Sequence, residues 1–318
     1  GESVQRESLK PGAVLCRIAA SHLRIGTLQY AATLSDVEAL KYLADYAMAR
    51  HYPQVRGQSN PYLAFLAAVG DAQAELVARW MGLGFVHGVM NTDNVAISGQ
   101  AIDFGPCAFL DTYCSDQVFS SIDSGGRYAW GRQPSIAAWN HARLAESLLP
   151  LLDKDQDKAI ALAMESVDRF NESIRDKVTA GFARKLGLTQ IRSGDESLIQ
   201  NLLSWMEDSK ADFTATFRAL TQKAARQSST TPLPEKDWLN AWFQRLQDET
   251  EPGSVMAAAN PRVHPRNRPV QSALDAADEG NLEPFQRLVR ALSHPWDADS
   301  DRSELEPSKI NGTRPFKT

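Results

Sequence analysis

Residues 87–110 read HGVMNTDNVAISGQAIDFGPCAFL, with an Asp-Asn pair and an Asp-Phe-Gly triplet separated by two short apolar runs. The runs VAIS and AIDF flank Gly99 and Gln100, which predicts a two-stranded hairpin. Asn94 and Asp103 would then lie across the open end of this hairpin from each other. Mg²⁺ takes hard oxygen ligands and accepts only one or two carboxylates from protein. The segment therefore predicts a magnesium site shared by Asn94 and Asp103.

The order of elements around this loop is the order of a protein-kinase C-lobe. A long predicted helix, the His87 loop, Asn94, the hairpin and Asp-Phe-Gly follow one another, and His87 and Asn94 have the kinase spacing of seven residues. Kinases keep the Asp that accepts the substrate proton two residues after the His, where this chain has Val89. A carboxylate reappears at Asp93, beside Asn94, as a base or a neighbour of the metal ligands. Standard phosphoryl transfer is therefore not expected.

The stretch 11–32, PGAVLCRIAASHLRIGTLQYAA, alternates polar and apolar residues and predicts one or two strands. Arg17 and Arg24 stand out in it. Two guanidinium groups on extended chain, or across a bend at Ser21 and His22, can converge on one polyphosphate. The alternative interpretation is a pair of surface arginines on a strand.

Apolar residues at helical spacing predict two long helices between this stretch and the His87 loop. The first has a capped start at Ser35-Asp36-Val37-Glu38 and ends before Pro53. The second follows Pro61 and stops at Gly82 and Gly84.

From Pro134 onward the sequence predicts almost only helices. Ser135 is the expected N-cap of a helix over 136–152. Further helices are predicted over 155–184, 196–225 and 234–247, with a helical pair at 270–293. Loops are predicted at 227–233 and 252–269, and a poorly ordered polar tail after 293. The tryptophans on predicted helices are interpreted as core residues: Trp139, Trp205, Trp238 and Trp242.

Composition excludes several classes of function. The chain has 318 residues and a net charge of -5, which argues against a broad nucleic-acid-binding surface. Three cysteines without a CxxC pair or a His/Cys cluster give no zinc framework and fit a reducing compartment. No apolar run approaches the roughly 18 residues of a membrane span. We expect a bacterial cytoplasmic protein that binds neither nucleic acid nor membrane.

Five blocks of the chain resemble the selenoprotein O (SelO) family of kinase-like protein adenylyltransferases. The first three are the more specific, and the last is the weakest. The blocks are LKPGAVLCRIAASHLRIGT (9–27), HGVMNTDN (87–94), IDFGPCAFLD (102–111), GRYAWGRQPSIAAWNHARLAESL (126–148) and NPRVHPRN (260–267).

The resemblance implies ATP bound in a flipped orientation, with AMP transferred to Ser, Thr or Tyr hydroxyls of target proteins. It implies that Arg17 and Arg24 reach the nucleotide phosphates and that Asp93 accepts the proton. It also implies that Asn94 and Asp103 hold Mg²⁺, with Mn²⁺ as the alternative ion, and that Asp103 thereby contacts the nucleotide as well. In-line nucleotidyl transfer needs a base for the hydroxyl, a metal ion on the transferred phosphate and cations on the departing pyrophosphate. The residues implied by the resemblance supply a candidate for each of these roles.

The expected fold is α+β, a mostly helical protein-kinase-like C-lobe with remnant N-lobe strands and a helical C-terminal extension. The expected divisions are 1–34 for the N-lobe remnant, 35–154 for the C-lobe with catalytic loop and Asp-Phe-Gly, and 155–318 for the extension. The Gly-rich loop and the Lys–Glu pair of a complete kinase-like N-lobe are not identified, and the chain begins without Met. We therefore expect a truncated form.

Two other functions remain open. A catalytically inactive pseudokinase would bind nucleotide without transfer, and a small-molecule phosphotransferase of the aminoglycoside kinase type would use a similar loop. The latter keeps an Asp at the position of Val89, which argues against it. Asp93 and Asn94 alone would suit a turn. Arg127 and Tyr128 would line the acceptor groove or pack in the core.

Overall fold

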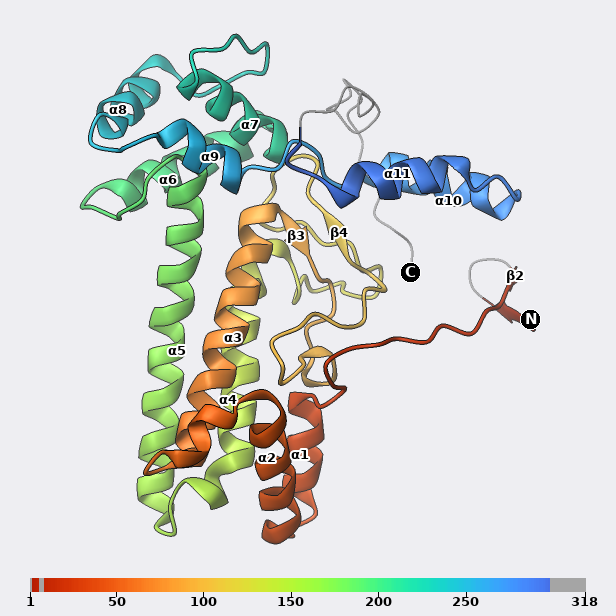
Figure 1. Cartoon of the computed structure of the whole chain (residues 1–318), viewed down its shortest axis with the longest axis vertical. Helices are drawn as coiled ribbons and strands as arrows, with labels where there is room; N and C mark the ends of the chain where they lie inside the picture. The colour runs from red at the N-terminus through yellow and green to blue at the C-terminus, as the bar shows by residue number, and fades with distance from the viewer. Residues whose placement is uncertain (1, 6–8, 298–318) are drawn as a thin grey trace.

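The computed structural model describes residues 2–5 and 9–297, and in this part the protein is mostly helical with few strands (Figure 1). The helices are α1 (Ile25–Thr33), α2 (Val37–His51), α3 (Pro61–Leu83), α4 (Gln133–Leu152), α5 (Gln156–Lys185), α6 (Asp195–Ser209), α7 (Phe213–Ala224), α8 (Lys236–Leu246), α9 (Pro252–Ala259), α10 (Asn267–Asp278) and α11 (Glu283–Ser293). The shorter elements are the strands β1 (Ser3–Gln5), β2 (Leu9–Pro11), β3 (Phe85–Val86) and β4 (Ala108–Phe109) and the 3₁₀ helices η1 (Pro53–Gly57), η2 (Thr92–Asn94) and η3 (Trp130–Arg132). β1 pairs with β2 and β3 with β4, both antiparallel.

The helices α3, α4 and α5 pack side by side and form the frame of the molecule (Figure 1). Local signals define α3: Asn60 Oδ1 accepts a hydrogen bond from the backbone N–H of Leu63 at 3.1 Å, and Pro61 occupies the first turn. Gly84, with φ 69°, ends the helix in the left-handed conformation that glycine adopts most easily. The predictions for α2 and α3 are confirmed.

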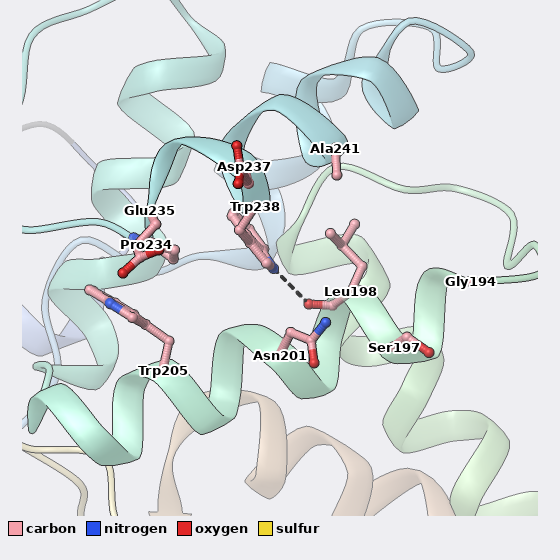
Figure 2. Close-up of a pocket in the computed structure, with 10 residues that line it drawn as sticks. All are labelled: Gly194, Ser197, Leu198, Asn201, Trp205, Pro234, Glu235, Asp237, Trp238 and Ala241. Atoms are coloured by element: carbon pink, nitrogen blue, oxygen red, sulfur yellow. Dashed lines mark hydrogen bonds between the residues drawn. The ribbon is translucent and has the colours of Figure 1, made fainter.

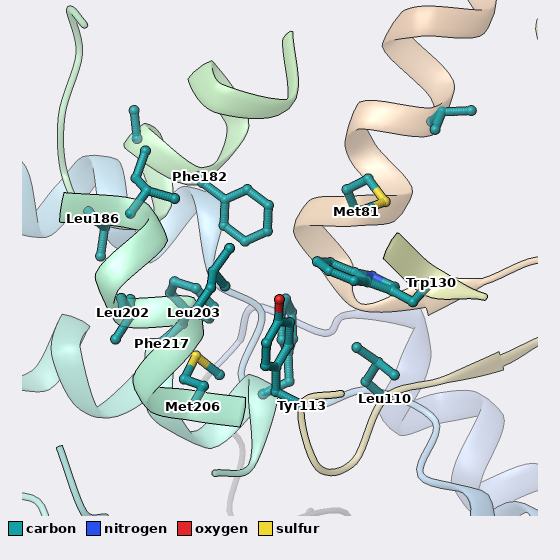
Figure 3. Packing of buried hydrophobic residues seen from close by; sticks show 14 of the residues in the cluster. Met81, Leu110, Tyr113, Trp130, Phe182, Leu186, Leu202, Leu203, Met206 and Phe217 are labelled. Carbon is teal, nitrogen blue, oxygen red and sulfur yellow. The ribbon is translucent and has the colours of Figure 1, made fainter. Parts of the chain in front are cut away.

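Two hydrophobic clusters flank this frame. One joins α1 and α2 to α3, α4 and the start of α5, and includes Ile25, Leu28 and Leu40. The other joins α3 and α5 to α6, α7 and the loop that follows β4 (Figure 3). In the second, Trp130 meets Tyr113 edge-to-face at 5.3 Å between ring centroids. The loop after β4 is thus packed into the core, which fixes the course of the chain near the site.

The prediction of one or two strands over residues 11–32 is wrong. β2 ends at Pro11, residues 12–23 form neither helix nor strand, and α1 begins at Ile25. Ile25, Leu28 and Ala31 recur at a spacing of three residues and are buried on one face of α1. Polar and apolar residues alternate over much of this stretch, so the local pattern does not separate strand from helix.

The predicted hairpin is reduced to a single bridge. Val95 and Ala101 pair antiparallel, but neither VAIS nor AIDF forms a strand of two or more paired residues. The chain at Ala96 pairs instead with Arg24, so partners from a distant part of the sequence fix its position. Gly99, with φ 71°, makes the turn.

Three details of the helical half also differ from the predictions. The helix predicted over 196–225 is two helices, α6 and α7, separated at Lys210, which has a φ of 52°. Part of the loop predicted at 252–269 is helical, because α9 packs Met256 into the core. Ser135 is not an N-cap, since α4 begins at Gln133 and Pro134 lies in its first turn.

The remaining predictions for this half are confirmed: helices near 155–184 and 234–247, a pair within 267–293, and a loop at 227–233. The polar tail predicted after 293 falls mostly outside the described residues. None of the described helices is long and apolar enough to cross a membrane.

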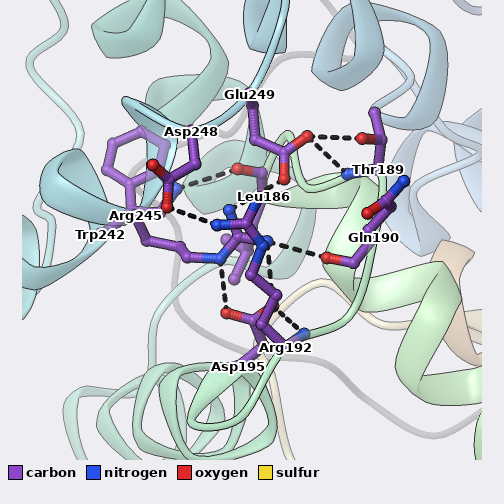
Figure 4. A network of polar contacts seen from close by, with 9 residues as sticks. All are labelled: Leu186, Thr189, Gln190, Arg192, Asp195, Trp242, Arg245, Asp248 and Glu249. Atoms are coloured by element: carbon purple, nitrogen blue, oxygen red, sulfur yellow. Dashed lines mark hydrogen bonds and ion pairs between the residues drawn. The ribbon is translucent and has the colours of Figure 1, made fainter.

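Buried ion pairs join α6 to the end of α8 (Figure 4). Arg245 Nε lies 2.9 Å from Asp195 Oδ1, and Arg245 Nη2 donates to the backbone oxygen of Gln190 at 2.8 Å. Asp195 is only 2% exposed and Arg245 12% exposed, so water screens this pair little. The orientation of α8 relative to α6 is therefore fixed by charge as well as by packing.

Candidate active site

His87 braces the loop over residues 87–94 from inside the protein. Its Nε2 donates to the backbone oxygen of Ile102 at 2.8 Å, and its ring stacks on Trp80 at 5.3 Å. The backbone N–H of Val89 approaches Nδ1 at 3.4 Å, which fits a neutral ring with its proton on Nε2. Burial lowers the pKa of His87 and keeps it neutral. His87 thus ties the loop to the residue before Asp103.

Sequence reasoning missed two buried polar residues that hold the same loop. Gln133 donates to the backbone oxygen of Phe85 and accepts from the backbone N–H of His87, both at 2.9 Å. Asn140 donates to the backbone oxygen of Met90 at 2.8 Å. Both lie on the buried face of α4. A polar residue at an otherwise apolar position of the helix is the only sign of their role in the sequence.

Asn94 lies at the end of η2, and its side chain is oriented by the loop. Its Nδ2 donates to the backbone oxygen of Val89 at 3.1 Å, and its backbone N–H donates to Asn91 at 2.9 Å. The amide nitrogen is thereby used within the protein, and Oδ1 remains the atom suited to a cation. The backbone of Val89, where a kinase has its Asp, contributes to this orientation.

Asp103 has a φ of 61°, the left-handed conformation that Asp adopts more readily than most residues. Its side chain is 46% exposed, and Arg17 Nη2 lies 4.0 Å from Oδ1. This separation is too long for a strong ion pair, and both groups are open to solvent. Arg17 and Asp103 therefore face the same region while each retains hydrogen-bonding capacity for a ligand.

Arg24 is the N-cap residue of α1 and is held against the segment that follows η2. The backbone N–H of Ile25 donates to Val95 at 3.0 Å, and that of Ile97 donates to Leu23 at 2.9 Å. The side-chain Nε of Arg24 is buried and has no hydrogen-bond partner in the described protein. A buried donor without an acceptor is costly, and an anionic ligand would satisfy it.

The start of α1 also meets Asp93. A Cβ placed on Gly26 would lie 2.2 Å from Asp93 Oδ1, so the carboxylate occupies the space that a side chain at residue 26 would fill. Asp93 is exposed. The structure thus brings Arg24 and Asp93 to the start of one helix, and Arg17 to Asp103.

The sequence predicts two donors for a metal ion, Asn94 Oδ1 and the Asp103 carboxylate. Among the described residues there is no group of three His, Cys, Asp or Glu side chains suited to a metal ion. Two hard oxygen donors fit an ion that completes its coordination with water and phosphate, which is the usual behaviour of Mg²⁺. They do not form a metal site made entirely of protein ligands.

The sequence does not predict a polar cluster near the segment that follows Asp103. The cluster consists of Asp111, Asp212, His264 and Arg266. Arg266 Nη1 lies 2.7 Å from Asp212 Oδ2 and 3.1 Å from Asp111 Oδ1, and His264 Nε2 lies 3.4 Å from the same Asp111 oxygen. Burial is the main cause of the lowered pKa of His264. The cluster joins the NPRVHPRN block to the segment eight residues after Asp103.

A family model described as "Protein adenylyltransferase SelO" matches residues 1–293. The chain is 44% identical over 324 residues to "Protein nucleotidyltransferase YdiU" of Bacillus mycoides (strain KBAB4), covering 100% of this chain and 66% of that protein. It is 44% identical over 326 residues to the protein of that name from Bacillus cereus (strain G9842), with the same coverage. The chain thus spans 66% of the length of these curated relatives. On this evidence, the chain belongs to the protein adenylyltransferase SelO family.

Proposed function

We propose that this protein takes part in ATP-dependent adenylyl transfer to hydroxyl groups of target proteins. The observation that supports it most is the meeting of α1 with η2. Arg24 and Gly26 come from the start of one helix, and they lie beside the loop that carries Asp93 and Asn94. A cation for phosphate, a carboxylate for a proton and an amide for a metal ion are thereby brought into one region.

In this proposal the acceptor is a Ser, Thr or Tyr hydroxyl whose oxygen attacks the α-phosphorus of ATP. Asp93 takes the hydroxyl proton as the new P–O bond forms. The bond from the α-phosphorus to the bridging oxygen breaks, and pyrophosphate leaves with that electron pair. Arg17 and Arg24 hold the phosphates and stabilise the departing charge.

The metal ion fits the donors that the chain offers. Asn94 and Asp103 would hold Mg²⁺, or Mn²⁺ in its place, and the bound ion would neutralise phosphate charge and polarise the α-phosphoryl group. Asp103 would meet the nucleotide through that ion. The unpartnered Nε of Arg24 supports an anionic ligand next to these residues.

We further propose that the catalytic loop belongs to a kinase-like C-lobe over 35–154, with 1–34 as part of the N-lobe and 155–318 as a helical extension. The packing of α5 along α3 and α4 supports a bracing role for the start of this extension. The bacterial relatives and the use of ATP support activity in the cytoplasm.

The position of the label distinguishes the three candidate functions. Purified protein is incubated with Mg²⁺ and ATP labelled on either the α- or the γ-phosphate, with a cell extract as the source of acceptors. Label from the α-position alone entering protein supports adenylyl transfer. Label from the γ-position alone, in protein or in a small molecule, supports phosphotransfer, and nucleotide binding without transfer supports a pseudokinase.

Two variants and one control test the assigned residues. Asp93→Asn and Asp103→Ala should lose most of the α-label incorporation, because each removes a carboxylate that the proposed reaction requires. Asp168→Asn, on the exposed face of α5, is the matched control and should keep full incorporation. Full activity of Asp93→Asn would rule out the role of that residue as base.

A further inference from the structure

A groove lies between α6 and α8, away from the candidate active site (Figure 2). Its volume is about 510 Å³, within the range of small-ligand and side-chain binding sites. Its lining includes Leu198, Trp205 and Trp238 together with the acidic residues Glu235 and Asp237. Figure 1 shows α6 and α8 at the opposite end of α5 from α1. A ligand in this groove would therefore leave the catalytic loop free.

Trp238 forms a rigid aromatic wall of the groove. Its Nε1 donates to the backbone oxygen of Leu198 at 3.0 Å, and its ring stacks on Trp242 with centroids 5.9 Å apart. Trp242 is fully buried, and its own Nε1 donates to Leu186 at 2.9 Å. The indole of Trp238 is thus fixed in advance, so a ligand that contacts it loses little freedom in the protein.

Trp205 forms a second wall, from α6, and lies near Pro234 at the other side of the groove (Figure 2). Trp205 and Trp238 are both partly buried and pack against the core. The interpretation of the helical tryptophans as core residues is therefore confirmed for Trp242 and incomplete for Trp205 and Trp238. It is wrong for Trp139, which is 37% exposed. Part of each ring surface faces the groove.

The charge of the groove has one sign. Glu235 and Asp237 line it and are exposed, and no Lys, Arg or His is among the lining residues. Lys236 lies between them in sequence but is not part of the lining. Two indole faces and two carboxylates are complementary to a cation, since the faces of aromatic rings carry negative charge. A nucleotide would gain the aromatic contact but would bring phosphates toward the carboxylates.

We propose that this groove binds a basic, extended segment of a partner protein, with an arginine side chain between Trp205 and Trp238. A guanidinium group is planar, stacks on indole and donates to carboxylates at its edge. Glu235 and Asp237 accept those hydrogen bonds at the rim. The buried ion pair between Arg245 and Asp195 joins α8 to α6 and so holds together the two helices that form the groove (Figure 4). This site does not depend on the proposed adenylyl transfer.

The probe for this site is a fluorescein-labelled, end-blocked peptide of alternating arginine and alanine, and binding is measured by anisotropy. A peptide with citrulline in place of arginine is the neutral control. We expect saturable binding of the arginine peptide and at least about tenfold weaker binding of the citrulline peptide. Equal binding of the two peptides, or of a proline-rich uncharged peptide, would show that the ligand is not a cation and overturn the assignment.

Variants locate the binding in the groove. Trp205→Leu should weaken binding about tenfold, through loss of one aromatic wall. The double variant Glu235→Gln and Asp237→Asn should weaken it about threefold, and because both residues are exposed it should fold normally. The matched control is Asp168→Asn with Glu172→Gln on the exposed face of α5, which removes the same charge elsewhere.

Unchanged binding in the control pair together with weaker binding in the groove pair supports the proposal. Equal weakening in both pairs would show non-specific attraction to an acidic protein and would overturn it. The same conclusion follows if the arginine peptide does not bind at millimolar concentration. Thermal melts of all variants separate a loss of binding from a loss of fold.

Discussion

Gly26 lies directly against the carboxylate of Asp93. A methyl group at residue 26 would lie 2.2 Å from Asp93 Oδ1 and 3.3 Å from the Asp93 backbone nitrogen. Gly26 is in the first turn of α1 and has no positive φ, so the helix itself tolerates alanine there. The glycine is needed for space beside the carboxylate and not for backbone conformation.

Gly26→Ala should therefore reduce adenylyl transfer without unfolding the protein. The side chain of Asp93 is exposed and can rotate away, which moves the proposed base from its position. A displacement of about 1 Å can lower a catalytic rate on the order of a hundredfold. Initial rates of α-label incorporation and a thermal melt measure the two effects.

The control for this variant is Gly82→Ala, in the last turn of α3, where a Cβ would meet nothing within 4 Å. It should keep the full rate. A Gly26→Ala protein with an unchanged rate would contradict the role of Asp93 as base, or its position in the active protein.

Asp103 combines an unusual backbone conformation with a carboxylate that we propose holds Mg²⁺, and two substitutions separate the two properties. Asp103→Asn removes the charge but keeps a side chain that tolerates the left-handed region, so it should lose Mg²⁺-dependent activity with little loss of stability. Asp103→Ala should lose activity and also about 1 kcal/mol of stability. Urea midpoints and metal-titrated rates of both variants measure this difference, and equal stabilities would contradict the backbone argument.

Arg266 neutralises two carboxylates at once, those of Asp111 and Asp212. Arg266→Gln should destabilise the protein on the order of 3 kcal/mol, because it leaves Asp111 and Asp212 without their cation in a partly buried site. Urea unfolding followed by circular dichroism measures the change. Arg175→Gln, in an exposed ion pair of 3.9 Å on α5, is the control and should have almost no effect.

Lys185 should make stability depend on pH above neutrality. Its ammonium group lies 4.2 Å from the ring centroid of Phe217, and burial lowers the pKa of Lys185 from 10.5 to about 7. In the unfolded chain the group stays protonated up to about pH 10.5. Between pH 7 and 10.5 the unfolded state therefore binds more protons, and the free energy of unfolding from this group rises with pH.

Lys185→Met should remove this contribution and fill the same space with an apolar side chain. We expect it to be more stable than the original protein at pH 7, by on the order of 1 kcal/mol or more, and the difference to shrink toward pH 10. Urea midpoints of both proteins across this range give the difference directly. A difference that does not vary with pH would contradict a lowered pKa of Lys185.

Much of the helical frame follows from local sequence. The side chain of Asn60, Pro61 and the left-handed Gly84 act within a few residues of the ends of α3, so their effect is visible in the sequence. The residue types of the candidate site are equally visible, because Asp93, Asn94 and Asp103 lie in a short segment with a known spacing. The sequence alone therefore identifies the loop that carries the proposed chemistry.

Only the tertiary structure decided how these residues meet. The sequence predicts a strand at the start of α1, because its apolar residues fit both an alternating and a helical pattern. In the structure, hydrogen bonds with residues 95–97 fix the start of α1 beside η2. Three contacts join residues that are far apart in sequence. They are the close approach of Gly26 to Asp93, the ion pair of Arg266 with Asp111, and the groove lined by Trp205 and Trp238. Local patterns reflect the conformation of neighbouring residues, whereas such contacts depend on how whole helices pack together.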